Sequence, residues 1–338
     1  MSHTFTPPVQ NADGERRRDE DTAGILRVAA YHRHDWDEIG IRPDPDEKAK
    51  RPRVHGVSLL DVFEHPDSQQ PWSVSLGPLS RLPPELLAAV LLELDVLSVV
   101  RFRAVNNLAR HAASALPQYR TVAAHAPVVL RALLRTGAAA RTALRDLHGL
   151  VASGSGACCL CGFFGPLLFI PTLSRCCFTC LTTSPELAAV PAPAAAKAAG
   201  VPRRRLLGAL RAVHTVPGEY GMWPKRRARR QHLVSSAAVL DVFGVSCAER
   251  PNEDTEVSRC MVVVALPHID RVSRQVTRCL SCQGCQQAVQ RSKGARLDLY
   301  DIRDRSYTAE GFLEHFDSCA DAQALWRAST AVASQQPK

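Results

Sequence analysis

The spacing of hydrophobic and polar positions predicts a mainly α-helical protein with a polar N-terminal segment. Residues 1–75 are rich in charged residues, proline and histidine and show little apolar periodicity, so we expect a disordered tail there. The first strong helical pattern follows the double proline at 83 and 84, which suits the first turn of a helix because its N–H groups have no intrahelical partner. Apolar residues then recur at every fourth position from Leu82 to Leu94, and Asp95 is placed to cap a second helix.

Helical spacing continues to about residue 152, where a Ser-Gly repeat at 153–156 indicates a flexible joint. The alanine-proline stretch at 191–202 is typical of a linker or a frayed helix. Residues 203–245 are interpreted as helical and basic, residues 260–266 as one buried strand, and residues 308–328 as a strong helix.

These patterns define the predicted organisation of the chain. We expect a disordered tail at 1–75, a helical module at 76–122, a helical extension at 123–152, a zinc-ribbon-like cysteine motif at 153–185, a linker at 186–205, a small zinc-stabilised α+β region at 206–328 and a tail at 329–338.

The segment 79–105 closely resembles the F-box, a helical module of roughly forty residues that docks a protein onto the Skp-type adaptor of SCF ubiquitin ligases. The positions that match are Leu79, Leu82, Pro83, Glu85, Leu86, Leu87, Val90, Leu94, Leu97, Val100, Phe102 and Val105. One departure is Asn106-Asn107-Leu108, where the family often has Arg and Trp. Apart from Glu85, the resemblance implies that these residues bind the adaptor, and through it a cullin. The alternative is an ordinary helical hairpin within a globular core.

The composition favours metal binding by the cysteines. The first thirty residues are polar and charged, which argues against a signal peptide, and no apolar run reaches the roughly eighteen residues that a membrane span needs. We therefore expect an intracellular protein of the cytoplasm, the nucleus or both, without membrane contact. Twelve cysteines in a reducing compartment indicate metal ligation in preference to disulfides.

The first cysteine group has the spacing of a four-thiolate zinc site. Cys158-x2-Cys161 and Cys177-x2-Cys180 are two C-x2-C pairs separated by fifteen residues, and two such pairs supply four ligands to one tetrahedral ion. Cys159 and Cys176 adjoin these pairs, so the choice between Cys176 and Cys177 stays open, as does the alternative of buried thiols without metal.

The second group combines Cys282-x2-Cys285 with His315-x3-Cys319, whose last two residues would share one face of a helix. Cys279 is an alternative ligand because Cys279-x2-Cys282 has the same spacing. His315 and Cys319 could equally face an apolar core. Together the two groups predict one or two structural Zn²⁺ ions, since thiolate-rich sites favour zinc.

The order of the motifs extends the resemblance to most of residues 76–328. An F-box, a helix ending in LLRTG, the paired cysteines and FLEHF-x-x-C resemble a set of filamentous-fungal F-box proteins. The resemblance implies a non-catalytic adaptor that recruits an unknown protein substrate through its zinc-stabilised C-terminal region.

Other functional classes fit less well. The net charge of +9 and the basic runs at 16–18, 203–205 and 225–230 leave a zinc-stabilised nucleic-acid-binding protein as the alternative. No basic run is interleaved with aromatic residues, so nucleic acid is not the expected partner. The run KRRARR at 225–230 fits either a nuclear import signal or a solvated helix face. Paired cysteines suit a closed metal site better than a catalytic nucleophile, so we expect no enzyme.

Overall fold

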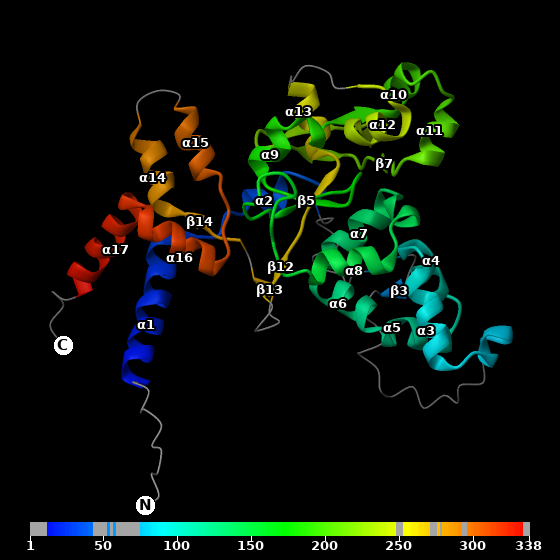
Figure 1. The fold of residues 1–338 in the computed structure, drawn as a ribbon, viewed down its shortest axis with the longest axis horizontal. Helices are drawn as coiled ribbons and strands as arrows, with labels where there is room; N and C mark the ends of the chain where they lie inside the picture. The colour runs from blue at the N-terminus through cyan, green and yellow to red at the C-terminus, as the bar shows by residue number, and fades with distance from the viewer. Residues whose placement is uncertain are drawn as a thin grey trace, which may run out of the picture. The chain divides into compact units, whose positions relative to one another are not determined.

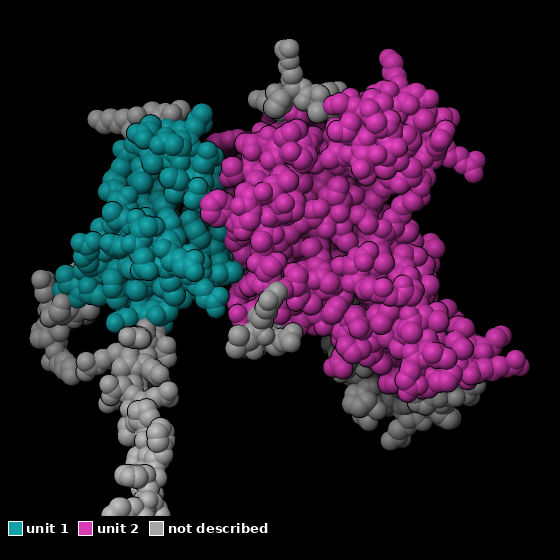
Figure 2. All heavy atoms as spheres, viewed as in Figure 1, with its two compact units in different colours: residues 1–33, 279–338 teal, residues 34–278 magenta. Residues whose placement is uncertain are grey.

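The computed structural model describes residues 12–42, 53–54, 57–58, 75–247, 253–270, 276–277, 279–292 and 296–333. It confirms a mainly helical chain with small antiparallel sheets (Figure 1). The chain divides into two compact units, residues 1–33 with 279–338 as unit 1 and residues 34–278 as unit 2 (Figure 2). The predicted region 206–328 is therefore split, because its residues after 278 pack with the N-terminal segment.

Unit 1 joins the two ends of the sequence. Helix α1 (Ala12–Ala29) lies beside α16 (Ala309–Ser318) and α17 (Ala320–Ala333), and β1 (Ala30–Tyr31) pairs antiparallel with β14 (Ser281–Cys282) (Figure 1). Two further helices, α14 (Gln283–Arg291) and α15 (Leu297–Arg303), complete the unit.

The expectation of a disordered tail needs correction for residues 12–42. Ala29 is fully buried in a core with Phe312 and Ala322, and Gly24 lies against the ring of Trp326. The segment has too few apolar residues to form a core alone, but it covers apolar residues almost three hundred positions later in the chain. The predicted tail at 329–338 also begins too early, because α17 continues to Ala333.

The predicted helix at 308–328 is two helices, separated at Cys319. The backbone of Cys319 is extended (φ −96°, ψ 99°), and its N–H bonds to the carbonyl of Phe316. This break redirects α17 onto α14, where Gly284 meets the backbone of Ala322. Long-range packing therefore overrides the continuous helical pattern of the sequence.

Unit 2 begins with a helical layer that contains the predicted module and extension. Its elements are η3 (Gly77–Arg81), α3 (Pro84–Glu93), α4 (Val96–Arg103), α5 (Asn107–Ala115), α6 (Pro117–His125), α7 (Pro127–Arg135), η4 (Ala138–Arg141) and α8 (Leu144–Ala152).

Local chemistry sets where these helices begin. Prolines occupy the first turns of α3, α6 and α7, and the Asp95 side chain caps α4 by accepting a hydrogen bond from the Ser98 N–H at 2.9 Å. The N–H of Val96 bonds to Thr142 and the N–H of Leu144 bonds to Leu94, at 2.9 and 3.1 Å. The predicted module at 76–122 and the extension at 123–152 are thereby joined in one layer.

A three-stranded antiparallel sheet of order β11-β4-β5 follows the helical layer. It consists of β4 (Leu167–Phe169), β5 (Ser174–Cys176) and β11 (Val263–Ala265), the last being the strand predicted within 260–266. Helix α2 (Asp35–Glu38) carries the buried Trp36 and is followed by Ile41, whose N–H bonds to the carbonyl of Val263 at 2.8 Å. The position of α2 and Ile41 beside β11 is a second reason why the polar N-terminal segment is ordered as far as residue 42.

The second three-stranded sheet, of order β6-β10-β7, contradicts two predictions. It consists of β6 (Ala189–Pro191), β7 (Val213–His214) and β10 (His232–Ser235), flanked by α10 (Ala192–Ala198), α11 (Arg203–Ala209) and α12 (Ser236–Phe243). Residues 186–205 are not a linker, because Ala192 and Ala195 are fully buried in this core. Small alanine side chains allow α10 to approach the sheet closely.

The other correction concerns the helix expected over 203–245. Between α11 and α12 the chain is strand and turn, including β8 (Gly218–Tyr220) paired with β9 (Lys225–Arg227). Pro217, Gly221 and Pro224 interrupt the helical pattern and favour turns.

The remaining elements are short. They are β2 (Arg53–Val54), β3 (Val57–Ser58), α9 (Phe178–Thr183), η5 (Pro185–Leu187), α13 (Glu253–Cys260), β12 (His268–Ile269) and β13 (Val276–Thr277). No helix within the described ranges combines the length and the apolar character needed to cross a membrane.

Candidate metal centres

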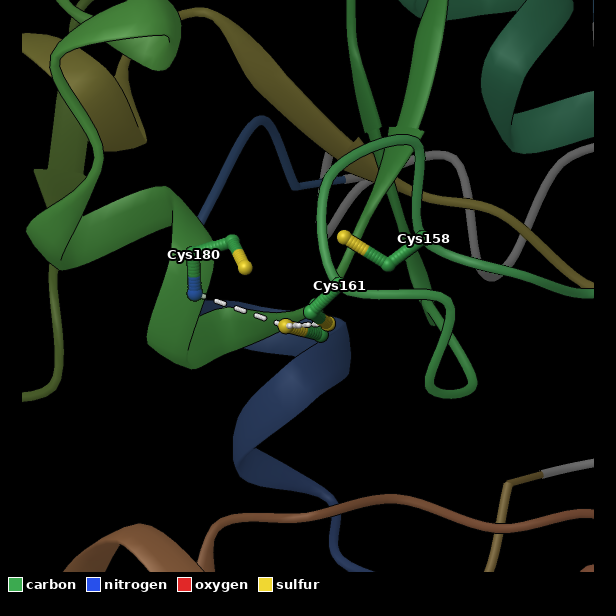
Figure 3. Close-up of side chains that lie close together, drawn as sticks. Cys158, Cys161 and Cys180 are labelled. Carbon is green, nitrogen blue, oxygen red and sulfur yellow. Dashed lines mark hydrogen bonds between the residues drawn. The ribbon is translucent and has the colours of Figure 1, made fainter.

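The four cysteines predicted for the first site come together in unit 2. The Sγ atoms of Cys158, Cys161, Cys177 and Cys180 all lie within 4.8 Å of one another. Figure 3 shows the labelled sulfur atoms of Cys158, Cys161 and Cys180 directed toward a common point. We call this group the first tetrad.

Two local structures place these thiols. Residues 158–161 form a tight turn in which Cys158 donates its N–H to Phe163 at 2.6 Å and Gly162 donates to Cys158 at 3.1 Å. Gly162 has φ 76°, a conformation that favours glycine. On the other side Cys177 is the N-cap of α9, and its Sγ accepts the N–H of Cys180 at 3.4 Å (Figure 3). Backbone N–H groups directed at sulfur stabilise thiolate charge, as the positive end of a helix also does.

The distances fit a tetrahedral ion. Zn–S bonds of about 2.3 Å require the sulfur atoms to be about 3.8 Å apart. The Sγ atoms of Cys161 and Cys177 are 3.6 Å apart. None of the twelve cysteines, all of them in the described ranges, forms a disulfide.

The structure decides between the adjacent cysteines. Cys176 is fully buried in β5, in register with Leu167, and lies outside the tetrad. Neighbouring residues of a strand point to opposite faces, so Cys177 alone of this pair reaches the other thiols. Cys159 is exposed and also lies outside the tetrad.

The electrostatics of the first tetrad call for a cation. A hydrogen bond from the Cys177 thiol lowers the pKa of Cys158 to about 4 and raises the pKa of Cys177 above its usual range. Desolvation raises the pKa of Cys180 to about 12. The four thiols therefore cannot all ionise near neutral pH by themselves, whereas a divalent ion would stabilise all four thiolates.

Two buried arginines, which the sequence analysis did not identify, stabilise the surroundings of this tetrad. Arg175 donates to the carbonyls of Gly165 and Pro267 at 2.7 and 2.9 Å, next to β4 and β5. Arg259 donates to the carbonyls of Leu181 and Ser184 at the C-terminal end of α9, both at 2.7 Å. In the sequence, each of these arginines could have been noticed as a charged residue directly beside a cysteine in an apolar stretch.

The second tetrad lies in unit 1 and comprises Cys282, Cys285, His315 and Cys319, whose ligand atoms also lie within 4.8 Å of one another. The Sγ atom of Cys319 is 3.8 Å from those of both Cys282 and Cys285. The Nε2 atom of His315 is 3.4 Å from the Sγ of Cys285, so Nε2 is the nitrogen that faces the thiols. These distances also match the edges of a tetrahedron around one ion.

The second tetrad repeats the local design of the first. Cys282 is the N-cap of α14, and its Sγ accepts the N–H of Cys285 at 3.4 Å. The ring of Tyr307 stacks on His315 with centroids 4.8 Å apart and so orients the imidazole. Cys279 is not part of the tetrad, which resolves the alternative left open by its spacing. His315 and Cys319 are near Phe312 and Phe316, but they face the thiols.

Hydrogen bonding with the Cys282 and Cys319 side chains raises the pKa of His315 to about 9 in the absence of an ion. The imidazolium then supplies the positive charge that the thiolates need. A bound divalent ion would replace this proton, because a ligating imidazole is neutral. Both tetrads are therefore consistent with structural metal ions, and their thiolate-rich donor sets suit zinc.

The residues of the F-box-like segment divide by exposure. Leu79, Leu86, Val90 and Val105 are exposed, and Pro83 is exposed beside them. Leu82, Leu94, Leu97 and Phe102 are partly buried. Leu87 and Val100 are buried within unit 2, where they stabilise the helical layer.

No protein-family model, no curated protein and no solved structure matches this chain. The resemblance of residues 79–105 to the F-box therefore depends on the residue pattern alone.

Proposed function

We propose that this chain is a non-catalytic adaptor that docks on the Skp-type subunit of an SCF ubiquitin ligase and presents a protein substrate. The observation that supports it most directly is an apolar ridge on α3. The side chains of Leu86 and Val90 are 55% and 46% exposed, although they lie on a helix whose opposite face is packed. Exposed apolar side chains that gather on one face of a helix are typical of a surface covered by a second protein.

An apolar groove adjoins this ridge and gives the docking partner a place to insert side chains. It has a volume of about 510 Å³ and lies between η3, α3 and α5. Its hydrophobic lining includes Leu76, Leu79, Leu82, Leu87, Leu91, Leu108 and Leu116. The ridge and the groove together form what we call the α3 surface.

The two tetrads have a supporting role in this proposal. Two Zn²⁺ ions would hold the ends of short elements together, one in each unit, and the folded C-terminal part would present the substrate. Isopeptide bond formation belongs to the ubiquitin-conjugating and RING components of such a ligase, and this chain contributes proximity and orientation.

The proposal is tested by the double variant Leu86→Asp, Val90→Asp in co-purification with a co-expressed Skp-type adaptor. Both residues are exposed, so folding should be retained. Burial of each side chain in an interface is worth roughly 1.5–3 kcal/mol, so the double variant should bind at least about a hundredfold more weakly.

The matched control is Leu240→Asp, Val242→Asp, which changes two side chains of α12 that are 51% and 50% exposed. It should co-purify with the adaptor as the wild-type chain does, and both variants should keep their metal content. Undiminished adaptor binding by the α3 variant would contradict the proposal.

A further inference from the structure

A two-stranded ribbon extends from the second sheet of unit 2. Its strands pair from His214 opposite His232 to Tyr220 opposite Lys225. Between the two sets of paired strands, Thr215 donates its N–H to the carbonyl of Gln231 at 2.8 Å. We call residues 213–235 the basic ribbon.

The tip of the basic ribbon is anchored. Tyr220 is 2% exposed, and its hydroxyl donates to the carbonyl of Val216. Gly221 turns the chain with φ 92° and donates its N–H to Ile39 at 3.0 Å. The residues that follow are therefore presented by a fixed turn, which reduces the conformational entropy lost when a ligand binds.

The basic ribbon carries an excess of positive charge, although Glu219 lies opposite Arg226 in the strand register. Arg226, Arg229 and Arg230 are exposed, and the described part of the chain offers none of them an ion-pair partner. Arg227 differs, because it pairs with Asp254 at 2.5 Å. Glu219 is the one acidic residue within 213–235.

The base of the ribbon adds polar groups that suit an anion. The rings of His214 and His232 stack with centroids 4.5 Å apart. The Nη2 atom of Arg203 lies 2.8 Å from Nδ1 of His232. The exposed Arg203 of α11 supplies the positive charge here, because desolvation and the neighbouring His214 and Arg203 lower the pKa of His232.

Trp223 lies at the tip, two residues before the first residue of the basic strand β9. Its side chain is 84% exposed, which is the largest value among the exposed large hydrophobic residues of the described chain. No aromatic residue interrupts the basic run 225–230, but the hairpin presents the indole ring of Trp223 at the tip from which this run continues.

We propose that the basic ribbon binds single-stranded nucleic acid, with a base stacked on Trp223 and phosphates contacted by Arg226, Arg229 and Arg230. Arginine matches phosphate with a planar pair of donors, and stacking on an indole accepts any base. An acidic peptide would form ion pairs with the arginines, but it would leave the exposed indole of Trp223 without a binding partner. A membrane surface would need more apolar area than Trp223, which is the only exposed large hydrophobic residue of the ribbon.

The test is fluorescence anisotropy of the full-length, metal-loaded chain with labelled 12-nucleotide oligo(rU) and oligo(dT), titrated over a range of salt. Stacking predicts that Trp223→Ala weakens binding of at least one of these oligonucleotides by roughly tenfold or more, whereas Trp223→Phe keeps most of the affinity. Three phosphate contacts predict that Arg226→Gln, Arg229→Gln, Arg230→Gln makes the slope of log K against log salt shallower by about two.

The matched control replaces Arg81, Arg101 and Arg120, which are exposed outside the ribbon, by glutamine. It should leave affinity and slope close to those of the wild-type chain. The proposal is overturned if neither oligonucleotide binds, or if the Trp223→Ala and ribbon-arginine variants bind as the wild-type chain does. It is also overturned if a 12-residue poly-Glu peptide or phosphatidylserine vesicles bind as tightly as the oligonucleotides. The outcome is independent of adaptor binding, which depends on the α3 surface.

Discussion

At the scale of single residues, the metal ligands are selected by the direction of each side chain. Cys159 and Cys161 lie in the same turn, yet only Cys161 faces the other thiols of the first tetrad. The two-residue spacing between the ligands of each C-x2-C pair could be read from the sequence. Which member of an adjacent pair points inward depended on the turn and on the strand that follows it.

Replacing Cys161 by serine should therefore lower the metal content from two ions to one per chain, because three thiolates hold zinc far less tightly than four. Cys159→Ser is the matched control, since Cys159 is equally exposed but lies outside the tetrad, and it should keep both ions. Elemental analysis of the purified variants measures the difference. Equal metal loss in the two variants would show that the ligand assignment is wrong.

At the scale of elements, helix packing in unit 1 depends on a close approach at Gly284. A Cβ atom at this position would lie 2.4 Å from the backbone nitrogen of Ala322 in α17. Because the ligand Cys282 is the N-cap of α14, the same contact aligns the second tetrad.

We expect Gly284→Ala to destabilise the protein by about 1–3 kcal/mol, since α14 and α17 must separate to accept the methyl group. Gly208→Ala is the matched control, because Gly208 is exposed in α11 and its added Cβ would meet nothing within 4 Å. That change should be neutral or stabilising by up to about 1 kcal/mol, as alanine is the better helix former. Thermal unfolding monitored by circular dichroism compares the two. A melting temperature of Gly284→Ala at or above that of the wild-type chain would refute the packing argument.

At the scale of the whole molecule, each compact unit contains one tetrad, so both units should depend on metal. Without metal, Cys180 and His315 bind protons strongly, because the pKa of the Cys180 thiol is raised to about 12 and the pKa of the His315 imidazole to about 9. A metal ion must displace these protons, and protons therefore compete with it.

Acidification from about pH 7 to about pH 5 should accordingly release metal and lower the melting temperature, with the loss increasing as pH falls. A strong chelator at neutral pH should lower the melting temperature in the same way. Release can be followed with a zinc-sensitive dye in parallel with thermal unfolding. An unchanged melting temperature after complete metal removal would show that the tetrads do not stabilise the fold.

The sequence by itself determined the features that depend on near neighbours. Prolines and Asp95 mark the starts of α3 and α4, C-x2-C spacing identifies the cysteine pairs, and helical periodicity places Leu86 and Val90 on one face of α3. These interactions join residues that lie close together in the sequence, so the local residue pattern is enough to predict the features that depend on them.

Tertiary structure decided the features that depend on distant parts of the chain. Helix α1 is ordered because residues near 320 cover it, α10 is ordered because a sheet receives its alanines, and the helix after Thr308 breaks at Cys319 where α17 turns onto α14. The basic run 225–230 became a ribbon because its partner strand precedes it across a turn. In each case the apolar area or hydrogen bonds that stabilise the segment belong to another part of the chain, and no local pattern reports them.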